Sequence, residues 1–281
     1  MAAFTARILP PGFRQAMYHL GPMTRSLRRL LNRSAPEGIL PVTIAAGDLA
    51  GFQLLLDLQV DKDLWLGTYE PEVARAVRDL ARPGMTAYDL GANIGYVTML
   101  LAKAVGERGR VISVEALPDN VDRLRAALRL NRMEARVTVV PKAVGAADRS
   151  GRFLVHSSPG MGRLESTPGR TAGFEMSIEV DVVSMDDLAY SQGNPLPDLV
   201  KMDLEGGEGE ALRGMERLLR EVRPILLIEV HGRAAADDVW NLLTPAGYGL
   251  QDLERGSRII SSREDLRSKT YLLATAGGGR G

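Results

Sequence analysis

Two pairs of ionisable side chains stand at the ends of two apolar segments in the second half of the chain. Asp203 and Glu205 follow one segment, and Glu229 and His231 end the next. Within each pair, the alternation of an extended strand puts both side chains on one side. Histidine titrates near neutral pH and can take a proton from a hydroxyl. We therefore take His231 as the first candidate for a general base, Glu205 as the second, and Asp203 as a third member of the same centre.

Other interpretations of this cluster stay open. Carboxylates and one imidazole also suit Mg²⁺ or Mn²⁺, so a divalent metal is possible, although the sequence does not predict one. A partly exposed histidine at a strand end with no catalytic role fits the pattern equally well. His156 is a further candidate for the base, in a segment inserted between two strands.

A second chemical feature is the turn Asp89-Leu90-Gly91-Ala92-Asn93-Ile94-Gly95, between a predicted strand and a predicted helix. Its glycines let the backbone approach a ligand, which the free N–H groups of the helix start then face. A dinucleotide-binding loop would need glycine where the chain has Asn93 and Tyr96. The turn resembles instead the D-x-G-x-x-x-G pattern with which class I methyltransferases hold the amino acid end of S-adenosylmethionine (SAM). The turn residues predicted to bind this cofactor are Asp89, Gly91, Asn93 and Gly95.

Two later segments fit an adenosine. Glu115 ends the second predicted strand, where an acid can accept hydrogen bonds from both ribose hydroxyls. Enzymes that bind NAD use the same device, so Glu115 alone does not discriminate between the cofactors. Lys142-Ala143-Val144 follows the third strand, where Ala143 is expected against the adenine ring, with Asp148 as a possible acceptor for its amino group.

The elements that must position these residues alternate between apolar strands and helices with one apolar face. This alternation predicts an α/β fold in which helices cover both faces of a mostly parallel sheet. The predicted strands are 86–90, 110–115, 137–140, 198–202, 224–230, 248–253 and 271–275. The predicted helices are 95–105, one beginning at Pro118, 208–222 and 237–243.

Segments outside this alternation complete the predicted organisation. Residues 42–60 predict a β-hairpin, and residues 70–80 predict a helix with Pro71 in its first turn. Between the third and fourth strands, 145–196 lacks a long helix and is predicted to contain two extra strands, 153–156 and 177–183. A polar loop at 157–173 joins them and is expected to help enclose a substrate, or else to be a surface excursion. The predicted divisions are an N-terminal basic, helical extension (1–40), a hairpin and helix packed on the core (41–80), a cofactor-binding domain (81–276) and a flexible tail (277–281).

Composition limits the classes of partner. Lysine plus arginine total 35 and aspartate plus glutamate total 35, so no overall charge attracts nucleic acid or an anionic membrane. The chain has no cysteine, which excludes disulfides, thiolate metal sites and cysteine nucleophiles. No segment approaches the roughly 18 apolar residues of a membrane span, and the N-terminus lacks the apolar core of a signal peptide. We expect a cytoplasmic protein.

Beyond single motifs, the chain resembles the FkbM family of methyltransferases over roughly residues 45–235. The segments that carry the resemblance are 67–71 (GTYEP), 88–96 (YDLGANIGY), 115–120 (EALPDN), 183–188 (VSMDDL), 200–208 (VKMDLEGGE) and 224–231 (PILLIEVH). Met185 and Gly207 depart from residues common in the family. The cofactor contacts assigned within these segments are Tyr69, Glu70, Ala116, Asn120 and Asp203.

The resemblance implies a Rossmann-like class I methyltransferase with a seven-stranded, mostly parallel sheet and a β-rich insertion between strands three and four. It also implies SAM-dependent O-methylation of a natural product or a sugar hydroxyl. An NAD-linked oxidoreductase and a SAM-binding protein without turnover are the alternatives. The expected partner is a small-molecule or glycan acceptor and not a nucleic acid, because residues 203–206 also lack the Asn/Asp-Pro-Pro-Tyr/Phe motif of amino-methylating enzymes. The acceptor's identity and the oligomeric state do not follow from the sequence.

Overall fold

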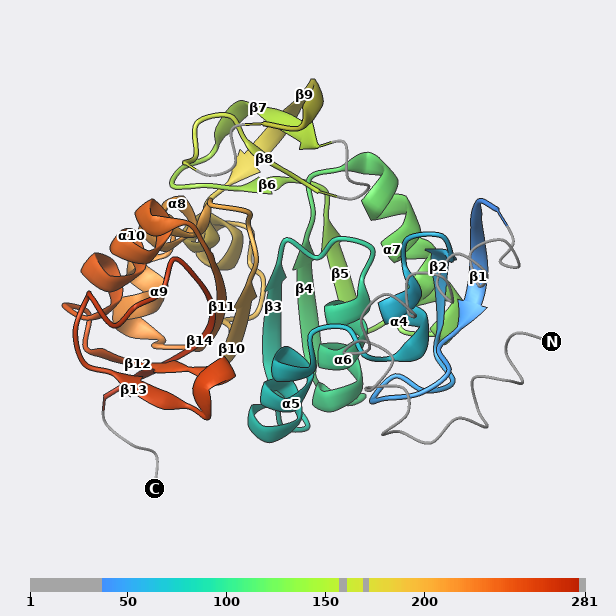
Figure 1. Cartoon of the computed structure of the whole chain (residues 1–281), viewed down its shortest axis with the longest axis horizontal. Coiled ribbons are helices and arrows are strands. Elements are labelled where there is room, and N and C mark those ends of the chain that lie inside the picture. Colours follow the sequence, from blue (N-terminus) through green and yellow to red (C-terminus); the bar gives the residue numbers. More distant parts are fainter. Residues whose placement is uncertain (1–36, 157–160, 169–171, 278–281) are drawn as a thin grey trace, which may run out of the picture.

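A twisted sheet of eight strands forms the centre of the computed structural model, which describes residues 37–156, 161–168 and 172–277 (Figure 1). Its strands, in spatial order, are β13 (Arg258–Ile260), β12 (Tyr248–Asp252), β14 (Lys269–Ala276), β11 (Ile225–His231), β10 (Leu199–Met202), β3 (Thr86–Leu90), β4 (Arg110–Val114) and β5 (Val137–Val140). The five strands from β11 to β5 are parallel, and β14 pairs with β11 in the antiparallel sense. The predicted α/β fold is confirmed. Seven strands were expected, and the eighth, β13, is a three-residue edge strand too short to give a periodic pattern.

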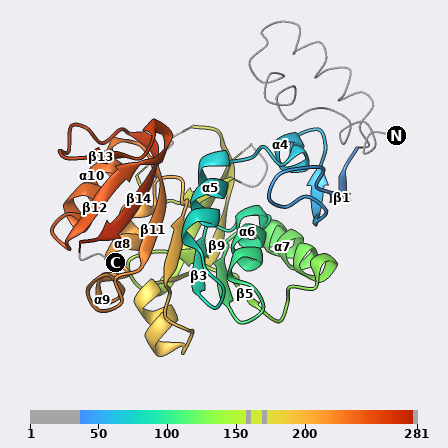
Figure 2. The same cartoon turned by 90° about the horizontal axis from the view of Figure 1, so that it is seen from below.

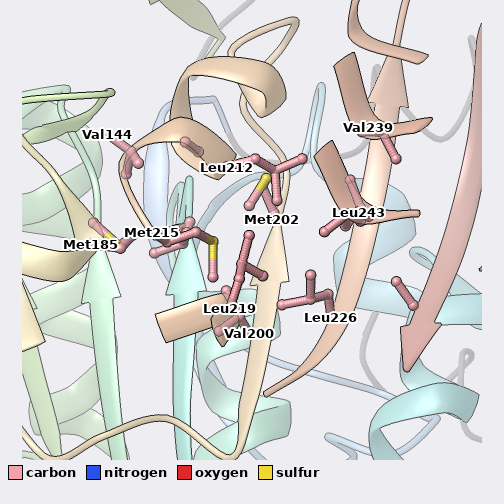
Figure 3. Close-up of a cluster of buried hydrophobic side chains, with 14 of the residues drawn as sticks. Val144, Met185, Val200, Met202, Leu212, Met215, Leu219, Leu226, Val239 and Leu243 are labelled. Carbon is pink, nitrogen blue, oxygen red and sulfur yellow. The ribbon is translucent and has the colours of Figure 1, made fainter. Parts of the chain in front are cut away.

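Helices cover both faces of this sheet (Figure 2). One group consists of α5 (Pro71–Leu80), α6 (Tyr96–Val105) and α7 (Pro118–Asn131), and the other of α8 (Glu208–Arg213), α9 (Glu216–Glu221) and α10 (Arg233–Leu243). Strand β10 is buried on both faces, since Leu199 belongs to the core under the first group and Val200 to the core under the second. Figure 3 shows that second core, where Met202 lies near Leu212 of α8 and Val200 lies near Leu219 of α9. Apolar packing on both faces therefore fixes where the strand ends lie.

The single helix predicted over 208–222 is wrong, because the chain breaks between α8 and α9. A Cβ atom on Gly214 would lie 2.2 Å from the carbonyl oxygen of Gly145, so the two backbones touch there. The Gly214 carbonyl accepts a hydrogen bond from the Asp186 N–H at 2.8 Å. The Asp186 carboxylate in turn accepts from the N–H groups of Arg217 and Leu218 at 2.8 and 2.9 Å, which gives α9 its own start. These contacts are made to residues far away in the sequence, so helical periodicity did not reveal them.

The predicted β-rich insertion is present as a separate four-stranded sheet. Its strands, in spatial order, are β6 (Ala143–Val144), β9 (Phe174–Val183), β7 (Arg149–His156) and β8 (Gly162–Leu164), and the π-helical turn η1 (Asp187–Ser191) follows. In Figure 1 this sheet lies above the carboxyl ends of β3, β4 and β5. Residues 157–160 and 169–171 of the predicted loop lie outside the described residues, and β8 stands between them.

The predicted N-terminal hairpin is confirmed as β1 (Ile39–Thr43) paired with β2 (Gln53–Asp57), followed by α4 (Lys62–Leu66). Arg123 of α7 donates to the Leu55 carbonyl and pairs with Asp61 at 2.7 Å, so the hairpin is attached to the first group of helices. The short 3₁₀ turn η2 (Leu253–Arg255) separates β12 from β13. The predicted basic extension up to residue 36 and residues 278–281 of the tail lie outside the described residues. Among those that are described, no helix combines the length and apolarity needed to cross a membrane.

We expect Gly214→Ala to destabilise the protein. Alanine is the better helix former by ~0.5–1 kcal/mol, but its methyl group would strike the Gly145 carbonyl, and overpacking of this kind costs about 1–3 kcal/mol. Urea unfolding followed by circular dichroism measures the difference. Gly249→Ala is the control, because its Cβ would lie 3.9 Å from the nearest atom outside its neighbours. A Gly214→Ala protein at least as stable as the wild type would contradict the explanation of the helix break.

Candidate active site

A cavity of about 400 Å³ opens where β3, β4, β10 and β11 end beneath the insertion. The turn before α5, the glycine turn after β3 and strand β8 also contribute to its wall. The predicted site residues that line it are Tyr69, Glu70, Gly91, Asn93, Glu115, Ala116, Ala143, Asp203, Glu205 and His231. Most of the residues predicted for a cofactor and the three predicted for catalysis therefore share one cavity.

The glycine turn is shaped by close contact with the end of β10. Gly91 has a φ of 78°, and a Cβ atom there would lie 1.9 Å from the carbonyl oxygen of Asp203. Only glycine satisfies both constraints. Asn93 also adopts a left-handed conformation, with a φ of 50°. The turn can thus present its backbone to a ligand in the cavity.

Glu115 is locked to this turn by its carboxylate. Oε2 accepts a hydrogen bond from the Asn93 N–H at 2.8 Å, while Oε1 accepts from the Leu117 N–H at 2.9 Å and from Asn120 Nδ2 at 3.2 Å. Burial raises the pKa of Glu115, and these hydrogen bonds oppose that shift. The acid and the turn form one unit, placed on the cavity wall as expected for a ribose contact.

Four other residues predicted to contact the cofactor lie outside the cavity wall. Asp89 is fully buried beneath the turn, and Gly95 packs closely against α7. Asn120 is buried and donates to Glu115. Asp148, suggested as an adenine contact, is exposed and accepts instead from a backbone N–H after β9. None of these four lines the cavity.

The predicted convergence of His231 with carboxylates is confirmed. His231 Nδ1 lies 3.0 Å from Glu208 Oε1, and Nε2 lies 3.3 Å from Glu229 Oε1. Nε2 is also 3.9 Å from Asp203 Oδ1 and 4.0 Å from Glu205 Oε2. One imidazole therefore contacts or faces four carboxylates, which we call the His231 cluster.

The His231 cluster opposes the predicted role of His231 as general base. Burial alone would lower the pKa of His231, but hydrogen bonds to Glu208 and Glu229 and the charge of Asp203 together raise the pKa to about 11. At neutral pH the ring then carries a proton on both nitrogens and cannot accept another. The carboxylates are then the groups that can accept a proton from a substrate, and Glu205 and Asp203 were already candidates.

Lys201 and Glu208 are functional candidates that the sequence analysis missed. Lys201 is buried, with Nζ 3.8 Å from Asp89 Oδ1 and 3.4 Å from Asp203 Oδ2. A lysine inside a strand that is otherwise wholly apolar was a signal available in the sequence. Glu208 begins α8, and its contact with His231 depends on how α8 packs against β11, which no local pattern reveals.

Three residues with a strained backbone conformation line the same cavity. Glu70, Asn93 and Glu205 have φ values of 42°, 50° and 51°. They are three of the six non-glycine residues with positive φ in the described part of the chain, and all three line the cavity. Each such conformation costs of order 1–3 kcal/mol and is typical of functional sites.

His156 lies apart from the His231 cluster. It lines a small neighbouring hollow together with Arg163, Phe174 and Glu205, and its ring stands edge-on to Phe174 at 5.6 Å between centroids. It does not line the main cavity, so its candidacy as a base gains no support.

Comparison with known proteins gives consistent matches. Residues 89–250, more than half of the chain, match the model of the methyltransferase FkbM domain. The hexuronic acid methyltransferase AglP of Haloferax volcanii is 28% identical over 202 residues, which cover 71% of this chain and 79% of that protein. Similar solved structures include methyltransferase FkbM from Methylobacillus flagellatus (19% identity, TM-score 0.43), where the match covers 72% of this chain but only 50% of the other. They also include an O-methyltransferase from Bacillus cereus in complex with S-adenosylhomocysteine (14% identity, TM-score 0.43), with 73% of this chain and 78% of the other covered.

We expect Glu115→Gln to weaken binding of S-adenosylhomocysteine about 10- to 100-fold, the usual effect of losing a charged hydrogen bond. The amide would also place a donor against the N–H groups that now donate to Glu115. Isothermal titration calorimetry gives the Kd, and thermal melting checks the fold. Glu165→Gln is the control, since this acid is half exposed on the insertion and outside the cavity. A folded Glu115→Gln protein with the wild-type Kd would rule out the predicted ribose contact.

Proposed function

Because the chain belongs to the FkbM methyltransferase family, we propose that it transfers the methyl group of SAM to a hydroxyl oxygen of a sugar or another small molecule. Membership of this family is the evidence for methyl transfer and for the use of SAM. The observation that carries the choice of a hydroxyl is the His231 cluster, whose members other than Glu208 line the same cavity as the glycine turn and Glu115. The relative named as a hexuronic acid methyltransferase supports a sugar as the acceptor.

The residues of the cavity wall support SAM as the ligand. Gly91 brings backbone against the ligand, and Glu115 offers carboxylate oxygens for ribose hydroxyls. Asp203 and Glu229 give negative charge to the wall, which suits a cofactor with a positive sulfur and a positive amino group. When bound, SAM supplies an electrophilic methyl group on that sulfur.

The carboxylates favour a hydroxyl over a carboxylate as the acceptor. A hydroxyl must lose a proton as it reacts, and a carboxylate within hydrogen-bond reach can take it. Glu205 is our candidate, with Asp203 beside it, while charged His231 holds both carboxylates in place. An acceptor that reacted through its own carboxylate would need no base and would be repelled by these acids.

Two observations argue against the alternative of an NAD-linked oxidoreductase. Tyr96 occupies a position where a dinucleotide loop needs glycine, and its buried ring stands edge-on to Tyr69 at 5.5 Å. Membership of a methyltransferase family points the same way. A SAM-binding protein without turnover is separated from our proposal by the next experiment. The cytoplasmic location stays a prediction.

The experiment incubates the protein with methyl-labelled SAM and a panel of neutral sugars, free hexuronic acids and glycans that contain them. We expect label in a product that survives mild alkali, because a methyl ether is stable where a methyl ester releases methanol. Label that alkali removes completely would overturn hydroxyl methylation. Tight binding of S-adenosylhomocysteine with no transfer to any acceptor would favour the protein without turnover.

We expect Glu205→Gln to lower kcat by about 10²- to 10⁴-fold, the usual contribution of a general base. The Kd for S-adenosylhomocysteine should stay within a factor of about three, because the predicted ribose and loop contacts lie elsewhere on the wall. Steady-state kinetics and calorimetry measure the two effects. Glu221→Gln, an exposed acid on α9, is the control. Unchanged kcat in Glu205→Gln would remove Glu205 from the mechanism.

A further inference from the structure

Three potential metal ligands of different residues face one space at the ends of β10 and β11. Asp203 Oδ1 and Glu205 Oε2 lie 3.9 and 4.0 Å from His231 Nε2, and ligand atoms of the three residues all lie within 4.8 Å of one another. Around a six-coordinate ion at ~2.1 Å, adjacent ligands stand about 3.0 Å apart and opposite ligands about 4.2 Å apart. The two separations from His231 Nε2 fall between these values, so the three ligand atoms need to move closer together to bind one ion.

His231 is held in the orientation of a metal-binding histidine. Glu208 is fully buried, and its Oε1 lies 3.0 Å from Nδ1, so Nε2 is the ring nitrogen on the side of Asp203 and Glu205, where Glu229 Oε1 also lies 3.3 Å from it. The same oxygen accepts from the Gly206 N–H at 3.2 Å, which fixes the carboxylate behind the ring. A carboxylate on the far nitrogen is the usual companion of a histidine that ligates a metal.

A carboxylate beside this ligand group has a buried oxygen without a hydrogen-bond partner among the described residues. Oε2 of Glu70 is buried and accepts no hydrogen bond from the described residues. Glu70 forms a second potential ligand group with Asp203 and Glu229, so its carboxylate faces the same region. Buried carboxylates are normally paired or bound to metals. Lys201 does not fill this need alone, because its Nζ already lies between Asp89 and Asp203.

We propose that Asp203, Glu205 and His231 bind one divalent cation of the Mg²⁺ or Mn²⁺ class, which in turn binds the oxygen of the methyl acceptor. Two carboxylates and one imidazole suit these hard ions. The chain has no cysteine, whose thiolate is the ligand that softer ions prefer. The ion would displace the proton from Nε2 of His231, orient the acceptor and lower the pKa of its hydroxyl. Glu205 would give Oε2 to the ion and keep its other oxygen as the proton acceptor. The role in catalysis rests on the proposed function, but the binding of the ion does not.

Binding is tested with Mn²⁺ alone, on protein freed of metal with EDTA and without SAM. The loss of the free Mn²⁺ signal in electron paramagnetic resonance counts bound ions, and we expect one saturable ion per chain. Asp203→Asn and His231→Gln should each weaken binding at least 10-fold, and Glu208→Gln, behind the ring, by about 10- to 100-fold. Glu205→Gln provides a further ligand variant should one of these fail to fold in a melting assay. Glu72→Gln is the matched control, an acid on the same cavity wall outside the ligand group, and should bind Mn²⁺ like the wild type.

The outcomes separate the ion from the reaction. No saturable Mn²⁺ binding by the wild type, or wild-type affinity in every folded ligand variant, overturns the site. Methyl transfer that stops in EDTA and returns with Mg²⁺ or Mn²⁺ supports the catalytic role, and full transfer in EDTA overturns it. One bound Mn²⁺, weakened by the ligand variants, with no methyl transfer under any condition supports the ion site and contradicts the proposed function instead.

Discussion

The arrangement of this site depends on the need to compensate negative charge buried at the ends of two parallel strands. Glu208 and Glu229 are buried, and they meet Asp203 and Glu205 around a single imidazole. Acids removed from water are costly unless positive charge or hydrogen bonds reach them. The positive charge on His231 therefore stabilises the carboxylates, and their charge in turn keeps the ring protonated in the metal-free centre. A divalent cation would supply the same charge from the cavity side.

The cofactor half of the cavity is joined to this centre through the backbone. Gly91 touches the Asp203 carbonyl, and Glu115 holds the turn through Asn93, so the turn and the end of β10 cannot move independently. Lys201 adds a buried link between Asp203 and Asp89 beneath the turn. A shift of the backbone at the end of β10 should thus move the turn where the cofactor is expected. The strained conformation of Glu205 shows that packing has overridden local preference at this point.

The sequence predicted most of the fold because the strands and helices that form the core carry strong local patterns. Strands β3 and β5 begin and end where expected, and the cavity brings together Glu115, Asp203 and His231 as their strand-end positions implied. The features that the sequence did not predict depend on tertiary contacts. They are the break at Gly214, the edge strand β13 and the contact of Glu208 with His231. The protonation state of His231 also escaped, because the pKa of an imidazole follows from its neighbours in space.

The central claim is that four carboxylates hold His231 as a cation in the metal-free protein, and a nitrogen NMR titration of the histidine rings tests it most directly. The chain has only three histidines, so a His231→Gln protein assigns the signal. With EDTA present, both ring nitrogens of His231 should give the shifts of a protonated ring from pH 6 to pH 9, since the pKa is raised to about 11. A ring that loses its proton near pH 6.5, as an isolated histidine does, would contradict the account.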